Sequence, residues 1–140
     1  MQTAVDTKQD PQNAQPEACT IKRGSNTRAP VIFASPHSGT IYPQQMTDLL
    51  TVPLSDLQRT EDAYVDELYA SAPDQGTVLL SANYARAFVD LNRDARELDS
   101  SMFVDGLPRV AGMPSARVKA GLGCLPRVGA SGRDIYAQQI

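Results

Sequence analysis

Short apolar runs and helix-like spacings alternate along this chain and predict strands and helices in turn. Residues 31–34 form an apolar run bounded by Pro and Gly, which is typical of a buried strand that enters a turn. Residues 77–81 and 87–89 are further β-prone runs. Residues 55–72 carry apolar side chains near helical spacing, between a capping serine and a proline, and residues 43–50 predict a shorter helix.

The order strand, helix, strand, strand predicts an α/β fold with a mainly parallel sheet and helices on its faces. Residues 1–18 are polar and predict a flexible tail, because they cannot bury enough apolar surface to offset their ordering entropy. Residues 19–140 are expected to form part of one domain. The segment from Arg96 onward is rich in Gly and Pro, and residues 135–140 resemble the opening of a helix that the sequence interrupts.

The net charge, the lengths of the apolar stretches and the cysteine spacing limit which partners and which cellular compartment we expect. The chain has 140 residues and a formal net charge of -3, so a nucleic-acid partner is not expected. No stretch approaches the roughly 18 apolar residues of a membrane span, and the N-terminus lacks the pattern of a secretory signal. Cys19 and Cys124 lie far apart and form no CxxC motif. These features predict a cytoplasmic protein with two free thiols and no membrane partner.

The only histidine, His37, lies in the run Ser-Pro-His-Ser-Gly directly after the first predicted strand. In open α/β sheets, ligands bind just beyond the carboxyl ends of strands, so His37 is a candidate metal ligand or proton carrier. A second ligand can come from Glu61 or Asp62. The alternatives are structural: a histidine that hydrogen-bonds its turn, and acidic residues that stabilise the start of a helix through its dipole. No HExxH pattern is present.

Arg86, Asn92 and Arg93 form a second group of candidates near the ends of the predicted strand 87–89. Two guanidinium groups and a carboxamide can hold a carboxylate and polarise a carbonyl. The alternative is that the arginines form salt bridges with nearby acidic residues, namely Asp90, Asp94 and Glu97. The basic, glycine-rich C-terminal segment carries no interleaved aromatic residues, so it fits an anionic small substrate better than a nucleic acid.

A series of motifs, in order, resembles the N-terminal half of the N-formylglutamate amidohydrolase family over about residues 29–140. These motifs are residues 36–39 with 42–43, 61–68, Arg86, 90–93, 97–99, 102–103, 117–123, 126–128 and 135–136. The family is related to zinc carboxypeptidases and aspartoacylase, which implies a phosphorylase/hydrolase-like, three-layer α/β/α fold. It also implies zinc-dependent hydrolysis of N-formyl-L-glutamate to formate and glutamate, a step of histidine degradation.

The resemblance also implies roles for single residues. His37 is expected to be the first zinc ligand and Asp62 the second, with Glu61 as the less favoured choice. Arg86 is expected to stabilise the oxyanion that forms when a zinc-bound water attacks the formyl carbon. Asn92 and Arg93 are expected to hold a carboxylate of the substrate, a small anionic N-acyl amino acid.

One part of the family pattern has no match here. The family carries a later segment resembling Asp-x-His-Ser that supplies another metal ligand, and its catalytic carboxylate comes from the same second half, whereas this chain has one histidine. The chain is therefore expected to be truncated, with an incomplete zinc site, an unpaired sheet edge and little activity alone. A C-terminal half or a second chain is the expected completing partner. The alternative is a non-catalytic remnant that binds an anionic amino acid or a partner protein.

Overall fold

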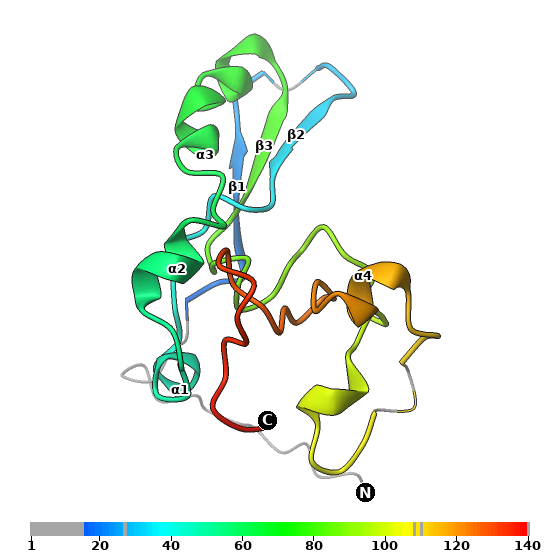
Figure 1. Ribbon diagram of the computed structural model, residues 1–140. Helices are drawn as coiled ribbons and strands as arrows, with labels where there is room; N and C mark the ends of the chain where they lie inside the picture. The colour runs from blue at the N-terminus through cyan, green and yellow to red at the C-terminus, as the bar shows by residue number, and fades with distance from the viewer. Residues whose placement is uncertain (1–15, 27, 108, 110, 140) are drawn as a thin grey trace, which may run out of the picture.

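Three short strands form a mixed sheet in the upper part of the molecule (Figure 1). The computed structural model describes residues 16–139 apart from 27, 108 and 110. The strands β1 (Cys19–Arg23), β2 (Ile32–Ser35) and β3 (Val78–Ala82) lie in the order β1-β3-β2. β2 runs parallel to β3, but β1 runs antiparallel to it, so the prediction of a mainly parallel sheet is not confirmed. The α/β class and the strands near residues 31–34 and 77–81 are confirmed.

The strand β1 was not predicted because its side chains carry no burial pattern. Four of its five residues are exposed, so the strand is held by its backbone pairing with β3 rather than by an apolar face. The pairing continues beyond the strand, because the Asn83 amide donates to the carbonyl of Ala18 at 3.1 Å. Of the predicted tail, residues 1–15 lie outside the described residues.

The predicted helix over residues 55–72 is wrong as one continuous element. The structure has α2 (Leu54–Gln58), α3 (Val65–Leu68) and a 3-10 turn, η2 (Ala72–Gln75), in its place. Between α2 and α3, the Asp62 amide donates to the carbonyl of His37 at 3.0 Å instead of to a helical carbonyl. Tyr64 then adopts a left-handed conformation with φ 65°. A tertiary hydrogen bond thus ends the helix where the chain meets the loop after β2.

Two further predicted elements are also wrong, and the predicted helix near residues 43–50 is reduced to α1 (Gln44–Thr47). Residues 87–89 form a turn, because the amides of Phe88 and Val89 both donate to the carbonyl of Ala85. The chain at Ile135 forms a bend between two isolated β-bridge residues rather than a helix, and its amide donates to the carbonyl of Arg127 while its carbonyl accepts from the amide of Thr51. The long C-terminal segment contains the 3-10 turn η3 (Ser100–Met102) and the helix α4 (Ala116–Lys119).

The buried core lies below the sheet, where α1 and α2 pack against the turn after β3 and the last residues of the chain. Its members are Met46, Val52, Leu57, Ala87 and Ile135. A smaller contact lies within the sheet region, where the rings of Phe33 and Tyr69 are 5.1 Å apart. Figure 1 shows the sheet with α3 in one region and α1, α2, α4 and the long loops in the other. The three-layer arrangement is not confirmed.

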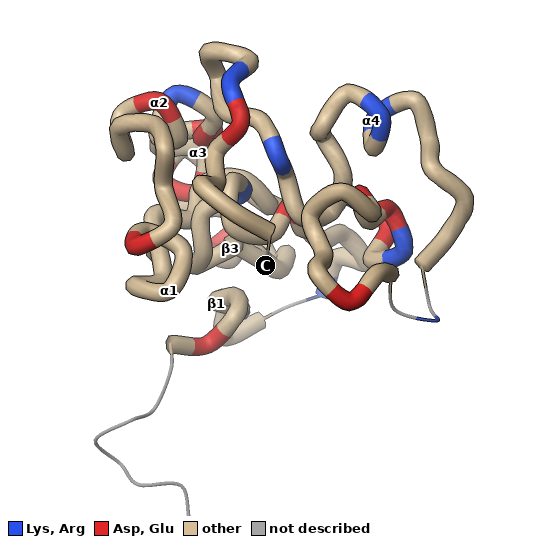
Figure 2. The backbone as a smooth tube through the Cα atoms, turned by 60° about the horizontal axis from the view of Figure 1, so that its bottom comes forward, with Lys and Arg blue, Asp and Glu red and all other residues tan. Residues whose placement is uncertain are grey.

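The basic residues are spread over the chain, and both cysteines are free. The Lys and Arg residues lie on several separate segments of the chain, with those of α4 apart from the rest (Figure 2). Cys19 and Cys124 are both free and half-buried, which confirms the prediction of two unpaired thiols. No helix in the described part of the chain is long and apolar enough to cross a membrane.

Candidate active site

His37 lies in the loop directly after β2 and is buried, with 7% of its surface exposed. This loop is locked onto the segment that follows β3, because the amides of Thr40 and Ile41 both donate to the carbonyl of Asn83. Gly39 permits the close approach, since a Cβ at this position would lie 2.1 Å from the carbonyl oxygen of Tyr84. The parallel pairing of β2 with β3 thus brings His37 next to the residues after β3.

Asp90 is the residue that organises this site. It is 3% exposed. Its Oδ1 accepts hydrogen bonds from Nε2 of His37 at 2.8 Å and from the backbone amide of Asn92 at 2.9 Å. Its Oδ2 accepts from the guanidinium of Arg86 at 2.8 Å. Burial by itself raises the pKa of Asp90, but the hydrogen bonds from these three donors hold the pKa below its ordinary value. Asp90 is therefore a carboxylate that joins the histidine to the arginine.

The Oδ1 atom of Asp90, which accepts two hydrogen bonds, fixes which nitrogen of the His37 ring carries the proton. The Asn92 amide is a donor, so Oδ1 of Asp90 acts as an acceptor, and Nε2 of His37 carries its proton. The other ring nitrogen, Nδ1, faces Oδ2 of Asp62 at 3.2 Å. In a neutral ring, this would set a lone pair of nitrogen against a carboxylate oxygen. A metal cation between the two atoms would remove this repulsion.

A zinc ion fits the spacing of these two atoms. Two ligand atoms that each lie about 2.0–2.1 Å from a tetrahedral zinc are about 3.3 Å apart, close to the 3.2 Å between Nδ1 of His37 and Oδ2 of Asp62. The Asp62 side chain is 53% exposed, so the pair is open on one side. Within the described residues, no group of three or more His, Cys, Asp or Glu could hold a metal. The described residues therefore bring together two candidate metal ligands, His37 and Asp62.

Glu61, the alternative ligand, has another partner. Its carboxylate accepts a hydrogen bond from the hydroxyl of Tyr42. Burial, together with the charge and the hydrogen bond of Glu61, raises the pKa of Tyr42. The phenol therefore remains a donor, and the structure brings Asp62 rather than Glu61 to the ring of His37.

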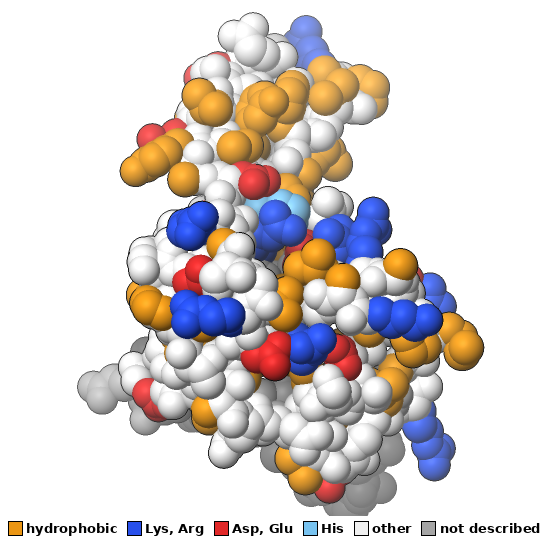
Figure 3. All heavy atoms as spheres, in the orientation of Figure 1, with side chains coloured by type: hydrophobic (Ala, Val, Ile, Leu, Met, Phe, Trp, Pro, Cys, Tyr) orange, Lys and Arg blue, Asp and Glu red, His pale blue; other side chains and the backbone are white. Residues whose placement is uncertain are grey.

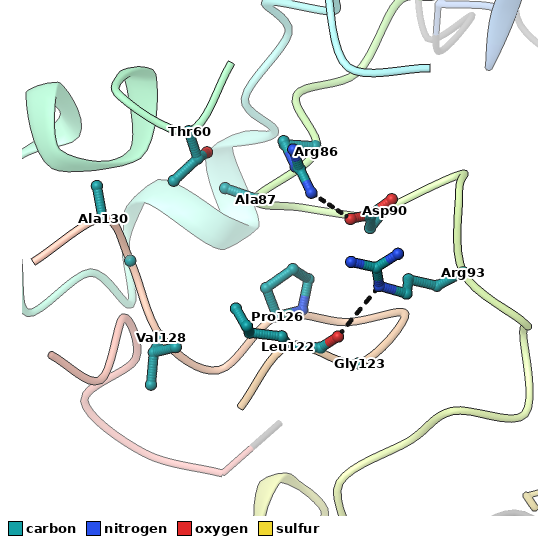
Figure 4. Close-up of a pocket in the computed structure, with 11 residues that line it drawn as sticks. Thr60, Arg86, Ala87, Asp90, Arg93, Leu122, Gly123, Pro126, Val128 and Ala130 are labelled. Carbon is teal, nitrogen blue, oxygen red and sulfur yellow. Dashed lines mark hydrogen bonds and ion pairs between the residues drawn. The ribbon is translucent and has the colours of Figure 1, made fainter. Parts of the chain in front are cut away.

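A pocket of about 260 Å³ lies beside Asp90 (Figure 4). Arg86 and Arg93 come from the segment after β3, and residues 122–130 of the long loop form the opposite wall. Arg86 is paired with Asp90, as the salt-bridge alternative proposed. Arg93 donates instead to the carbonyls of Leu122, at 3.3 Å, and Asn92, at 3.1 Å. No ion pair with Arg93 is seen in the described part of the chain, so the pocket contains one uncompensated positive charge.

The other sequence-predicted residues are placed differently. Asn92 is exposed and its side chain does not line this pocket, although its backbone amide donates a hydrogen bond to Asp90. Among the basic residues of the C-terminal segment, Arg127 pairs with Asp99 and Asp134 and so joins parts of the long loop to one another. Sequence reasoning missed Asp90 as a partner of His37 and named it only as a salt-bridge candidate. Its place two residues before Asn92 was the available signal.

The long-loop wall of the pocket is anchored by Asp56, a buried residue of α2. Its carboxylate accepts from the backbone amide of Ser131 at 3.1 Å and from the Ser131 hydroxyl at 2.9 Å. Gly129 lies against the same carboxylate, because a Cβ at Gly129 would be 2.4 Å from Oδ2 of Asp56. The loop thus reaches the pocket through contacts with α2.

We expect Asp56→Ala to lower the free energy of unfolding by about 1–3 kcal/mol, because it leaves the Ser131 donors without their acceptor. Urea unfolding followed by circular dichroism measures this change. Asp48→Ala is the matched control, since Asp48 is exposed and its carboxylate accepts from the side chain of Gln44 alone among the described residues. Equal losses in the two variants would contradict the anchoring role of Asp56.

Comparisons with known proteins concern the chain as a whole. The sequence pattern of one protein family, N-formylglutamate amidohydrolase, matches residues 29–140. The fold is similar to the crystal structure of N-formylglutamate amidohydrolase from Ralstonia eutropha JMP134, with a TM-score of 0.78 and 27% sequence identity. The match covers 88% of this chain and 43% of that one, so this chain spans less than half of the solved relative. A search of curated proteins found no match.

Proposed function

This chain belongs to the N-formylglutamate amidohydrolase family, and we propose that its pocket is the substrate-binding part of a zinc-dependent hydrolase for N-formyl-L-glutamate. One observation supports the proposal above the others. Asp90 joins a candidate metal ligand, His37, to Arg86, which lines an anion-binding pocket. A hydrolase of N-acyl amino acids needs these two features side by side. The products are formate and glutamate, and the place of the reaction is histidine degradation in the cytoplasm.

Each residue of the proposed site has a distinct task. His37 and Asp62 hold the zinc, which supplies Lewis acidity and a water of lowered pKa when it is bound. Asp90 orients the His37 ring so that Nδ1 faces Asp62, in the way that carboxylates orient metal-bound histidines. Arg86 donates one N–H to Asp90 and keeps other donors for the oxygen of the formyl group as negative charge develops there.

Arg93 supplies the uncompensated positive charge for the substrate carboxylate, and Asn92 supports Arg93 through its backbone carbonyl, which accepts from the guanidinium at 3.1 Å. A third zinc ligand and a proton-transfer carboxylate are needed in addition. We propose that they come from a completing C-terminal half or second chain, so the 140-residue chain by itself hydrolyses little substrate. A non-catalytic remnant that binds anionic amino acids through Arg93 is the second candidate, and the unpaired charge of Arg93 favours it.

The test combines zinc content, substrate binding and turnover of N-formyl-L-glutamate for the purified chain and two variants. We expect Arg93→Ala to weaken binding of N-formyl-L-glutamate by about 10–100-fold, as the loss of a charge-assisted hydrogen bond predicts. Isothermal titration calorimetry measures this change.

Arg117→Ala is the control, because Arg117 is exposed on α4 and does not line the pocket. Equal binding by the wild type and Arg93→Ala would contradict both candidate functions. Binding without any zinc uptake would favour the non-catalytic remnant. Rapid turnover by the isolated chain would show that no completing partner is needed.

A further inference from the structure

The candidate active site lies where two regions of the molecule meet. In Figure 3 the only histidine of the chain is visible at the narrow junction between the sheet region and the region of the long loops, with acidic and basic side chains around it. The loop of His37 follows β2, whereas Asp90 belongs to the segment that follows β3. The geometry of His37 with Asp90 therefore depends on how these two segments are joined at the junction.

Asn83, the first residue after β3, joins the two segments. Its backbone carbonyl accepts hydrogen bonds from the amides of Thr40, at 3.1 Å, and Ile41, at 3.0 Å. Two residues further on, the amide of Ala85 donates to the carbonyl of Ile41 at 3.0 Å. The loop after β2 is thus attached to the chain just before Asp90. A change in the orientation of Asn83 would move this loop relative to Asp90.

The side chain of Asn83 is held from the other direction by residues 16–20, which we name the N-terminal segment. Nδ2 of Asn83 donates to the carbonyl of Glu17 at 3.0 Å, and Oδ1 accepts from the hydroxyl of Thr20 at 2.8 Å. A carbonyl can only accept, so Glu17 fixes which end of the amide faces it. The backbone amide of Asn83 also donates to the carbonyl of Ala18 at 3.1 Å. Three hydrogen bonds therefore hold Asn83 with its own carbonyl directed at the loop after β2.

The contact between Asn83 and the loop of His37 leaves little free space. The next residue, Tyr84, is fixed as well, because its hydroxyl donates to the carbonyl of Pro16 at 3.1 Å. A Cβ at Gly39 would lie 2.1 Å from the carbonyl oxygen of Tyr84. Because the two segments are packed so closely, a backbone rotation at residues 83–84 displaces the loop. The pattern of the family begins at residue 29, so it assigns no role to the N-terminal segment.

We propose that Asn83 is a positioning residue for the metal site. It passes the hold of the N-terminal segment on to the loop after β2, and so keeps Nε2 of His37 on Asp90 and Nδ1 opposite Asp62. Asn83 acts through this loop, since it does not line the pocket. The inference rests on the proposed function only in taking His37 and Asp62 as the metal site, and the orientation of the ring can be measured without a metal.

Asn83→Ala tests the proposal in the full chain. The change removes both side-chain hydrogen bonds and keeps the backbone ones, so we expect a folded chain by circular dichroism with a looser loop after β2. The ¹⁵N NMR signals of the single histidine should show the proton on Nε2 in the wild type and a shift toward Nδ1 in the variant. The reason is that a ring released from Asp90 can donate to Asp62 instead. Zinc affinity should fall about tenfold, the low end of the range for groups that orient a metal ligand.

Thr20 offers a matched pair of variants on the other side of the same hydrogen bond. Thr20→Val keeps the shape of the side chain and loses the hydroxyl, so it should shift the His37 signals in the same direction as Asn83→Ala. Thr20→Ser keeps the hydroxyl and should leave these signals unchanged.

Thr77→Val is the control for a general loss of stability. Thr77 is buried directly before β3, at the end of the strand opposite to Asn83, and its hydroxyl donates to the carbonyl of Ala72 at 2.6 Å. Loss of this buried hydrogen bond should destabilise the chain without changing the His37 signals.

Unchanged His37 signals in Asn83→Ala would overturn the proposal. A change of equal size in Thr77→Val would overturn it too, because the effect would then reflect stability alone. If Asn83→Ala does not fold, the two Thr20 variants decide in its place, and equal signals from them contradict the proposal. If the wild type takes up no zinc, the proposed hydrolase fails, whereas the NMR signals still decide the role of Asn83.

Discussion

We expect Asp90→Asn to lower the free energy of unfolding by about 3 kcal/mol, near the low end of the range for breaking a buried ion pair. All three groups that face the Asp90 carboxylate are donors: the His37 ring, the Asn92 amide and the Arg86 guanidinium. An asparagine would turn its NH₂ group toward at least one of these donors in either orientation. The loss stays near the low end because the Arg86 side chain remains 24% exposed and water can reach it. Urea unfolding measures the change.

Asp94→Asn is the matched control for this prediction. Asp94 also pairs with an arginine, Arg96, but both side chains are largely exposed, so the loss is expected to be much smaller than that of Asp90→Asn. The single histidine provides a second readout, because its ring nitrogens give one set of ¹⁵N NMR signals. The wild type should show the proton on Nε2, and Asp90→Asn should shift that equilibrium. Similar stability losses in Asp90→Asn and Asp94→Asn would contradict the central role of Asp90.

The same interaction predicts a pH dependence. The pKa of Asp90 is held below its ordinary value of 3.8. A carboxyl group whose pKa is lower in the folded state stabilises the protein fully above its unfolded pKa, and this contribution disappears as the pH falls through the folded pKa. The stability difference between the wild type and Asp90→Asn should therefore be constant at neutral pH and shrink below about pH 4. A difference that grows on acidification would contradict this assignment.

The second large effect concerns the metal. We expect His37→Ala to weaken zinc binding by at least about 100-fold, more than the 10–100-fold typical of residues that only orient a ligand. No second histidine can replace it. The reason is that Nδ1 of His37 and Oδ2 of Asp62 form the pair whose spacing fits zinc. Competition with a chromophoric chelator measures the affinity, and binding should tighten as the pH rises because protons compete for the same nitrogen.

The neighbouring acidic residues provide the controls for the metal site. Asp62→Ala should weaken zinc binding strongly, whereas Glu61→Ala should have little effect because Glu61 is bound to Tyr42. The reverse order would show that Glu61 is the ligand. Unchanged zinc binding in His37→Ala would show that the His37–Asp62 pair is a structural hydrogen bond and would contradict the proposed hydrolase.

The local sequence determined those features of this protein that depend on neighbouring residues alone. The apolar runs near residues 31–34 and 77–81 predicted two strands, and the position of His37 after the first strand predicted its place in a strand-end loop. The motifs were specific enough to predict the family, which the match over residues 29–140 confirms. These signals succeed because a buried strand and a functional loop each leave a pattern in a few consecutive residues.

Only the tertiary structure decided the rest, because the deciding contacts join residues far apart in the chain. β1 forms through backbone pairing with β3, which leaves no pattern in its side chains. The helix predicted over 55–72 breaks because the amide of Asp62 donates to the carbonyl of His37. Ile135 is not helical because its backbone hydrogen-bonds to Thr51 and Arg127 instead. Likewise, the sequence named His37, Asp62 and Arg86, but the buried carboxylate of Asp90 connects His37 to Arg86. Hydrogen bonds across the fold outweigh local helix and strand preferences of less than about 1 kcal/mol per residue.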